Sequence, residues 1–140
     1  MNKDIMFSSV SDDWGTPQHF FNLLDQEFHF VLDACASEHN AKCLSYFTKE
    51  DDALLQRWDY GGYVFCNPPY GRIMNKFVEK AYIENQYGVP IVLLLPARTD
   101  VKWFHNYIYN QHEIRFIKGR LHFNDSKDPA PFPSMVVVMR

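Results

Sequence analysis

The chain has 140 residues, of which 46% are hydrophobic and 22% charged, and its formal net charge is −3. This composition is typical of one globular domain with a real core, and it excludes a generally basic nucleic-acid binder, so that any such contact needs a local patch. Three cysteines without CxxC spacing indicate reduced thiols, and no apolar run is long enough to cross a membrane. We therefore expect a cytoplasmic protein without membrane association, with residues 1–13 loosely ordered and residues 14–140 forming one domain.

In chain order, the apolar patterns predict alternating helices and strands. Thr16 is typical of a helix N-cap and Pro17 of a first helical position. Strands are predicted at 30–32, 45–47, 63–66, 91–95, 113–117 and 134–139, and later helices at 51–57, 73–86 and 99–110. This alternation predicts an α/β fold, a mostly parallel Rossmann-like sheet with helices on both faces and a last strand that runs antiparallel.

The ends of three predicted strands mark the expected site. Ligands of such sheets bind outside the carboxyl ends of the strands. Asp33, Asn67 and Pro96 each follow a predicted strand, so we expect them along one edge. Cys35, His39 and Cys43 recur at every fourth residue, but no fourth ligand is evident, and we expect no metal site.

The segment Asn67-Pro68-Pro69-Tyr70 ends one of these strands with two residues that lack a backbone donor. The rigid turn can direct the Asn67 side-chain oxygen and the Pro68 carbonyl oxygen into the crevice. Two acceptors side by side suit a planar amino group, and they stabilise the positive charge that such a nitrogen develops when it attacks. Tyr70 can stack on a flat substrate. The alternative is a stiff turn without a chemical role, because short motifs recur by chance.

This tetrapeptide resembles the catalytic motif of S-adenosylmethionine-dependent amino-methyltransferases. Further segments match the same enzymes in order, and together they make the chain similar to the phage-type DNA N-6-adenine methyltransferase family from about Trp14 to the C-terminus. These segments are Trp14-Gly15-Thr16-Pro17, the LDACAS loop at 32–37, the stretch 46–54, and Ala130-Pro131-Phe132-Pro133-Ser134. The resemblance implies a Rossmann-like methyltransferase sheet.

The resemblance also implies a role for each matching residue. Asn67 and the Pro68 carbonyl hold the adenine amino group in the turn that Pro69 stiffens, and Tyr70 stacks on the flipped base. The implied cofactor site consists of Trp14, Thr16 and Pro17 at the methionine end, Asp33, Ala34 and Ser37 in the cofactor loop, and Asp51 and Asp52 at the adenosine. Asp33 has an alternative role as a helix N-cap, and Asp51-Asp52 as a charge pair at a helix start.

Two departures from the family pattern affect these expectations. The LDACAS loop has no glycine, although its small residues still allow close approach to a ligand. No segment is long enough for a separate target-recognition domain. Sequence specificity therefore has to come from loops 70–74 and 121–133 or from a homodimer or a separate specificity partner, or else the enzyme discriminates little between sequences. The candidate nucleic-acid contacts are Arg115, Lys118, Arg120 and Phe132, with a solvated edge and a core-filling ring as the alternatives.

The sequence thus predicts an enzyme that moves a methyl group from S-adenosylmethionine to the exocyclic amino group of adenine in double-stranded DNA, with the base extruded from the duplex. One alternative is the same chemistry on a protein glutamine or an RNA base. Another is a non-catalytic binding protein with the S-adenosylmethionine fold. Through the resemblance alone, we expect modification of phage DNA against host nucleases, as in restriction-modification, in the cytoplasm of a bacterial host.

Overall fold

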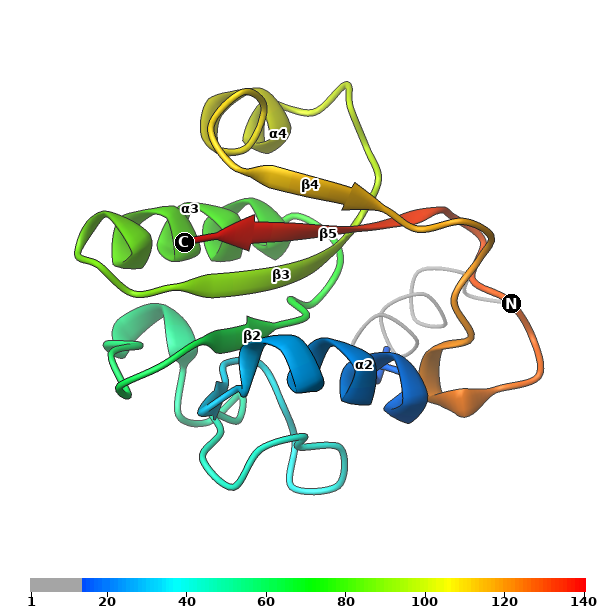
Figure 1. Cartoon of the computed structure of the whole chain (residues 1–140), viewed down its shortest axis with the longest axis horizontal. Coiled ribbons are helices and arrows are strands. Elements are labelled where there is room, and N and C mark those ends of the chain that lie inside the picture. Colours follow the sequence, from blue (N-terminus) through cyan, green and yellow to red (C-terminus); the bar gives the residue numbers. More distant parts are fainter. Residues whose placement is uncertain (1–13) are drawn as a thin grey trace.

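The computed structural model describes residues 14–140, so the expectation for residues 1–13 lies outside the described residues. Its centre is a five-stranded sheet in the order β1-β2-β3-β5-β4 (Figure 1). The strands are β1 (Leu32–Asp33), β2 (Val64–Cys66), β3 (Ile91–Pro96), β4 (Glu113–Phe116) and β5 (Ser134–Met139). β1, β2 and β3 are parallel, whereas β5 runs antiparallel to both β3 and β4. The predicted α/β sheet with an antiparallel C-terminal strand is confirmed.

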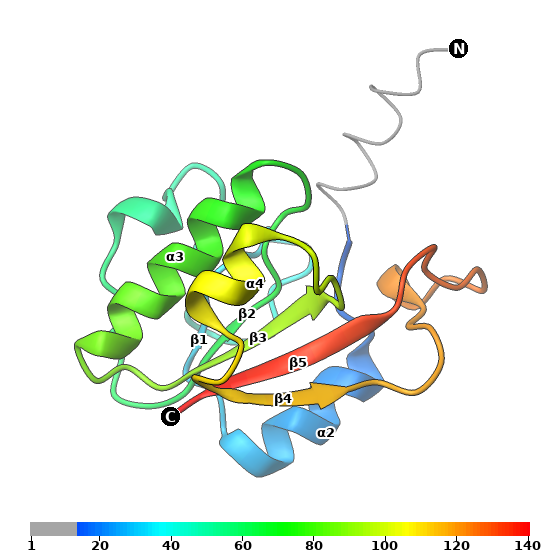
Figure 2. The ribbon, with the colours of Figure 1, turned by 90° about the horizontal axis from the view of Figure 1, so that it is seen from above.

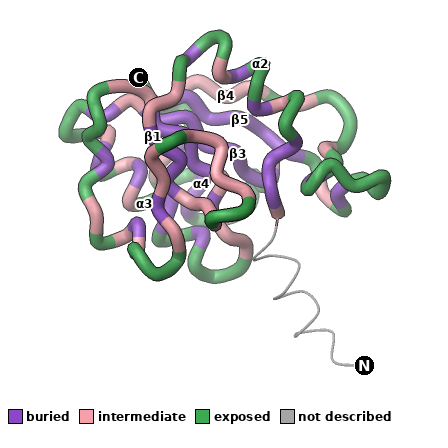
Figure 3. Tube along the Cα trace, turned by 90° about the horizontal axis from the view of Figure 1, so that it is seen from below, coloured by how far each residue is buried: buried purple, intermediate pink, exposed green. Residues whose placement is uncertain are grey.

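Helices cover both faces of the sheet, as predicted. α2 (Gln18–Phe28) lies on one face, and α3 (Ile73–Gln86) and α4 (Lys102–Tyr107) lie on the other (Figure 2). Successive side chains of a strand point to opposite faces. Accordingly Leu93 of β3 joins the α3 side of the core, while Leu94 joins the α2 side. Every residue of β3 and β5 is buried, and the connecting loops carry most of the exposed chain (Figure 3).

Four predicted elements and one predicted helix cap differ in the structure. The predicted strand 30–32 lies instead at Leu32–Asp33. The predicted strand 45–47 is a single bridge between Tyr46 and Asp33, because β1 itself has only two residues. The predicted helix 51–57 is a short 3-10 turn, η1 (Ala53–Leu55), and a second one, η2 (Phe123–Asp125), lies in the loop before β5. α4 is shorter than predicted because Val101 is extended and the helix ends at Tyr107. Thr16 does not cap α2.

The start of α2 explains this last error. Pro17 takes the N-cap position, and no side chain makes a capping hydrogen bond there. The Thr16 hydroxyl instead accepts a hydrogen bond from Asn67 Nδ2 at 3.1 Å. The Thr16 hydroxyl oxygen is therefore used in a tertiary hydrogen bond, although the local sequence predicted that it caps the helix.

Candidate active site

The turn after β2 separates two cavities. Its residues Asn67, Pro68 and Pro69 line a larger cavity of about 1030 Å³, and Tyr70 and Arg72 line a smaller one of about 750 Å³. Gly71, between them, has a φ of 102°, so the chain enters α3 through a conformation that favours glycine. The predicted meeting of strand ends is confirmed for Asp33 and Asn67, which share the larger cavity. Pro96 lines the smaller cavity instead.

The side-chain amide of Asn67 has a defined orientation. Nδ2 donates to the Trp14 carbonyl oxygen at 2.7 Å and to Thr16 Oγ1 at 3.1 Å. A backbone carbonyl only accepts, so the atom that faces Trp14 has to be the NH2 group. Oδ1 is consequently left on the other side, buried and without a hydrogen-bond partner. An unpaired buried acceptor is costly, and it indicates a missing donor at this cavity wall.

Tyr70 is held in a cluster of four aromatic rings. Its ring centroid lies 5.4 Å from that of Trp14, 5.0 Å from that of Phe132 and 6.3 Å from that of Phe123. The hydroxyl is buried without a partner, and this burial raises the pKa of Tyr70 above its ordinary value. The phenol therefore stays neutral, and the ring has a fixed place in the wall of the smaller cavity.

Asp33 organises the loop that follows β1. The residue is 3% exposed, and its Oδ1 and Oδ2 accept hydrogen bonds from the backbone N–H groups of Cys35 at 3.3 Å and Lys42 at 3.0 Å. Burial raises the pKa of Asp33 to about 6, although both hydrogen bonds oppose this. The carboxyl group thus serves the loop and also lines the larger cavity.

The structure brings most of the expected cofactor residues to one cavity. Those that line the larger cavity are Trp14, Thr16, Asp33, Ala34, Ser37 and Asp52. Pro17 and Asp51 do not line it. Pro17 is buried at the start of α2, and Asp51 Oδ2 accepts hydrogen bonds from the N–H at 2.8 Å and the hydroxyl at 3.0 Å of Thr48, which close the turn before η1.

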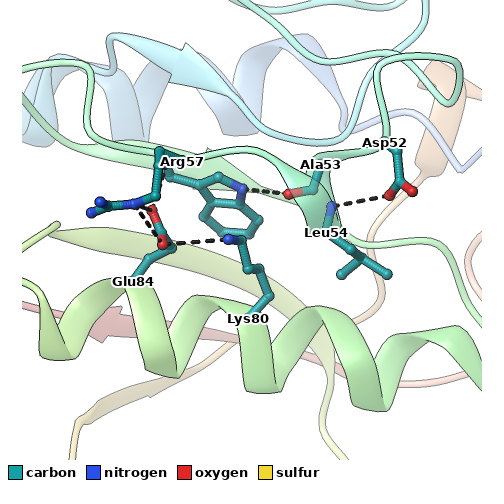
Figure 4. Close-up of polar contacts among 7 residues, drawn as sticks. Asp52, Ala53, Leu54, Arg57, Lys80 and Glu84 are labelled. Carbon is teal, nitrogen blue, oxygen red and sulfur yellow. Dashed lines mark hydrogen bonds and ion pairs between the residues drawn. The ribbon is translucent and has the colours of Figure 1, made fainter.

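The position of Asp52 depends on a network that sequence reasoning missed (Figure 4). Asp52 accepts a hydrogen bond from Leu54 N–H and so caps η1. Beyond η1, the buried indole of Trp58 donates to the Ala53 carbonyl at 2.9 Å, and Trp58 N–H donates to Glu84 Oε1 at 2.6 Å. α3 therefore holds the rim of the larger cavity through a buried glutamate.

Glu84 lies almost fully inside the protein, with 2% of its side chain exposed. Arg57 Nε lies 3.1 Å and Lys80 Nζ 3.4 Å from its Oε2. Burial opposes ionisation, but the hydrogen bonds from Trp58 and Arg57 and the charge of Lys80 outweigh it and hold the pKa of Glu84 below its ordinary value. The apolar pattern of α3 places position 84 on its buried face. A glutamate at such a position is the sequence signal that could have predicted a buried charge network.

The expected nucleic-acid contacts are separated in the structure. Arg115 is bound by Glu27 through two hydrogen bonds of 2.6 and 2.7 Å and also by Glu113. Arg120 Nη1 donates to the Ala130 carbonyl at 3.3 Å, and Lys118 is exposed. None of the three basic residues lines either cavity, whereas Phe132 lines the smaller one.

Three other basic residues were missed, and they surround the smaller cavity: Arg72, Arg98 and Lys102. Each follows the carboxyl end of β2 or β3 by two to six residues. The signal that could have found them is this position relative to the strands, since they are scattered along the chain and form no cluster in the sequence.

Within residues 14–140, no group of three or more His, Cys, Asp or Glu side chains is arranged to hold a metal ion. The three cysteines are free thiols, and burial raises the pKa of Cys35 and of Cys43 to about 12. None of the described helices has the length and apolar character needed to span a bilayer.

The chain is similar to known DNA methyltransferases. The family model described as DNA N-6-adenine-methyltransferase (Dam) matches residues 4–140. The chain is similar to the DNA N-6-adenine-methyltransferase of Haemophilus phage HP1 (strain HP1c1), with 35% identity over 147 aligned positions that cover 99% of this chain and 84% of the relative. It is 34% identical over 114 residues to the DNA N-6-adenine-methyltransferase of Escherichia phage T1, which covers 81% of this chain and 48% of that relative.

A third relative is the putative methyltransferase YfdM of Escherichia coli (strain K12), which is 42% identical over 67 residues, covering 44% of this chain and 74% of the relative. The matched region thus spans about half the length of the phage T1 protein and most of the length of the other two.

Proposed function

We propose the function of this chain from the premise that it belongs to the DNA N-6-adenine-methyltransferase (Dam) family, whose model matches residues 4–140. The proposed activity is the transfer of a methyl group from S-adenosylmethionine to the exocyclic amino group of adenine in double-stranded DNA. The observation that carries this proposal is Asn67 Oδ1, a buried acceptor without a partner at the wall of the larger cavity.

Asn67 acts on the amino group of the base. Oδ1 accepts one of its two N–H donors, and the Pro68 carbonyl accepts the other. These acceptors draw the nitrogen lone pair out of conjugation and stabilise the positive charge that develops on the nitrogen. Because Trp14 and Thr16 already hold the NH2 end of the side chain, the oxygen needs no reorientation during the reaction.

The larger cavity fits S-adenosylmethionine. Its volume of about 1030 Å³ is close to that of cofactor sites, and its lining contains two lysines, Lys42 and Lys49, and four carboxylate side chains, so that acidic groups predominate. The carboxylates are Asp33, Glu38, Glu50 and Asp52. These charges suit a ligand with a sulfonium and an ammonium group, and the apolar residues Phe47 and Leu54 suit its adenine ring. Bound S-adenosylmethionine would supply a methyl group on a sulfonium sulfur. The amine nitrogen would gain the carbon bond that the sulfur loses, which would leave a neutral thioether, and the amine would release one proton to solvent.

The smaller cavity accommodates the extruded nucleotide. Tyr70 and Phe132 present aromatic surface there, and such surface stacks on bases. Extrusion costs a few kcal/mol of lost stacking and pairing, which stacking on aromatic side chains partly offsets. We place the reaction in the cytoplasm of a bacterial host, in line with the phage origin of the relatives.

The test is a methylation assay with the full chain and S-adenosylmethionine labelled at the methyl group. We expect label on the adenines of double-stranded genomic DNA of mixed sequence and none in a duplex of guanine and cytosine alone. Asn67→Ala is expected to abolish transfer, and Asn106→Ala, an exposed asparagine on α4, serves as the matched control. Label in RNA or in protein glutamine, with none in adenine-containing DNA, would overturn the proposal.

A further inference from the structure

The smaller cavity has an unusual charge for this chain. Its lining contains three basic residues, Arg72, Arg98 and Lys102, and no aspartate or glutamate. The larger cavity, on the other side of the Asn67–Tyr70 turn, has four carboxylates and two lysines in its lining, and the whole chain has a net charge of −3. Positive charge is therefore concentrated beside the turn, on the side of Tyr70.

These cations are largely available to a ligand. Arg72 and Lys102 are exposed, and neither forms an ion pair with any residue in the described part of the chain. Arg98 lies 3.9 Å from Asp100, but both side chains are mostly exposed, so this pair contributes little. Arg115, by contrast, is neutralised by Glu27 and Glu113.

The rest of the lining indicates which ligand these charges serve. Tyr70, Trp103 and Phe132 give the cavity an aromatic wall beneath the charged rim. Aromatic rings next to arginine and lysine form the usual site for a nucleotide, since rings stack on bases while cations bind phosphate oxygens. A volume of about 750 Å³ accommodates one nucleotide.

We propose that Arg72, Arg98 and Lys102 bind the phosphates that flank the target nucleotide and so anchor the DNA strand at the smaller cavity. This inference rests on the proposed function, because it takes DNA as the ligand. Tyr70 and Arg72 belong to one turn, so a phosphate on Arg72 holds its nucleotide next to the ring and to Asn67. Phosphate contacts carry no sequence information, and the rim therefore positions the strand without selecting its sequence.

The test measures the affinity of the full chain for a fluorescent 12-base-pair duplex at several salt concentrations, with bound S-adenosylhomocysteine. Each lost phosphate contact lowers the slope of log affinity against log salt by about 0.9. We expect the double variant Arg72→Ala/Lys102→Ala to lose about two such contacts, and Arg98→Ala to lose about one. Cofactor affinity, measured by calorimetry, is expected to stay within twofold in these variants.

Two control variants show whether the change in slope is specific to the rim of the smaller cavity, which consists of Arg72, Arg98 and Lys102. Lys76→Ala removes an exposed lysine of α3 outside both cavities, and Lys118→Ala tests the basic segment that the sequence indicated. We expect both to retain the parental slope, and duplexes of unrelated sequence to lose affinity equally in the rim variants. A parental slope in the double variant overturns the inference, and so does the absence of DNA binding by the wild-type chain. If the wild-type chain methylates adenine while the double variant keeps that slope, only the rim is refuted and the proposed function stands.

Discussion

Asn67 and Thr16, which are 51 residues apart in the sequence, are joined by a hydrogen bond of 3.1 Å from Asn67 Nδ2 to Thr16 Oγ1. The bond connects the turn after β2 with the segment before α2. It also fixes which end of the amide is hydrogen-bonded and leaves Oδ1 without a partner. Thr16 is thus a positioning residue for the proposed acceptor.

The first prediction distinguishes the role of the acceptor, Asn67 Oδ1, from that of Thr16, which holds the Asn67 side chain in place. Asn67→Ala removes Oδ1 and is expected to lower the single-turnover rate of methyl transfer by a factor of about 10³, in the range found for lost preorganised groups. Thr16→Val removes one of two acceptors for Nδ2, and we expect a loss of only about tenfold because the Trp14 carbonyl still holds the amide.

Cofactor affinity is the second readout of this pair. We expect Asn67→Ala to bind S-adenosylhomocysteine within a few-fold of the parental chain, because the amide acts on the base. Thr16 lines the larger cavity, so Thr16→Val is expected to bind it more weakly. Equal losses of rate in the two variants would contradict the separate roles of Asn67 and Thr16.

The second prediction concerns the hydroxyl of Tyr70, which is buried without a partner. Tyr70→Phe removes an unsatisfied polar group and keeps the ring, so we expect stability to be unchanged or higher by about 1 kcal/mol. Tyr70→Ala removes three aromatic contacts and is expected to cost about 3–5 kcal/mol. Urea denaturation of both variants measures the difference.

Activity discriminates further between ring and hydroxyl. Methyl transfer by Tyr70→Phe is expected to remain close to parental because stacking survives, whereas Tyr70→Ala should raise the KM for DNA. A similar loss in both variants would mean that the hydroxyl, and not the ring, is the functional part.

The third prediction is a pH dependence that originates at Asp33. Its pKa is raised from 3.8 to about 6 by burial, so the folded state holds this proton more tightly than the unfolded state. The contribution of this group to stability is therefore complete below pH 3.8 and is lost as the pH rises through 6. The ammonium group of S-adenosylhomocysteine prefers the ionised form, and the affinity of this ligand should fall by up to about tenfold for each pH unit below 6.

Calorimetry with S-adenosylhomocysteine between pH 5 and 8 tests this dependence on Asp33. Asp33→Asn should bind more weakly at pH 8 and show a flat profile. The thiols of Cys35 and Cys43 remain neutral over this range because burial raises each pKa to about 12. His39 also lines the cavity, and His39→Gln is the control. A profile that His39→Gln flattens and Asp33→Asn leaves unchanged would refute the assignment.

The sequence predicted best those features that depend on local pattern. Residues 73–86 and 134–139 were predicted with the bounds that α3 and β5 have, because each is an uninterrupted pattern between turn residues. Thr16 was predicted wrongly because a partner 51 residues away uses its hydroxyl.

Long-range charge pairing explains the other difference. Arg115 lies in a basic stretch of the sequence, but Glu27, 88 residues earlier, neutralises it in the structure. Arg72 and Arg98 come together only because β2 and β3 are neighbours in the sheet. Neither the pairing of Arg115 nor the proximity of Arg72 and Arg98 can be predicted from a local sequence pattern.

The last prediction concerns Glu84, the buried carboxylate that holds the segment after η1. Glu84→Ala leaves Trp58 N–H and Lys80 without their acceptor, and breaking a buried ionic contact of this kind costs about 3–5 kcal/mol. Glu84→Gln keeps an acceptor for Trp58 N–H and should cost less. Because the pKa of Glu84 is lowered from 4.5, its stabilisation is lost as the pH falls below that value, and Glu84→Gln should lose this acid dependence.

Cofactor binding shows whether this network serves only stability. Glu84 reaches the cavity through Trp58, which follows η1, and through Ala53, the first residue of the turn that Asp52 caps. We therefore expect Glu84→Gln, at a temperature where it is fully folded, to weaken binding of S-adenosylhomocysteine by about tenfold, the equivalent of 1.4 kcal/mol. Glu79→Gln is the matched control, since Glu79 is an exposed glutamate of the same helix and lines neither cavity. Parental affinity in folded Glu84→Gln would restrict Glu84 to a structural role, because the cavity rim would then keep its shape without the charge.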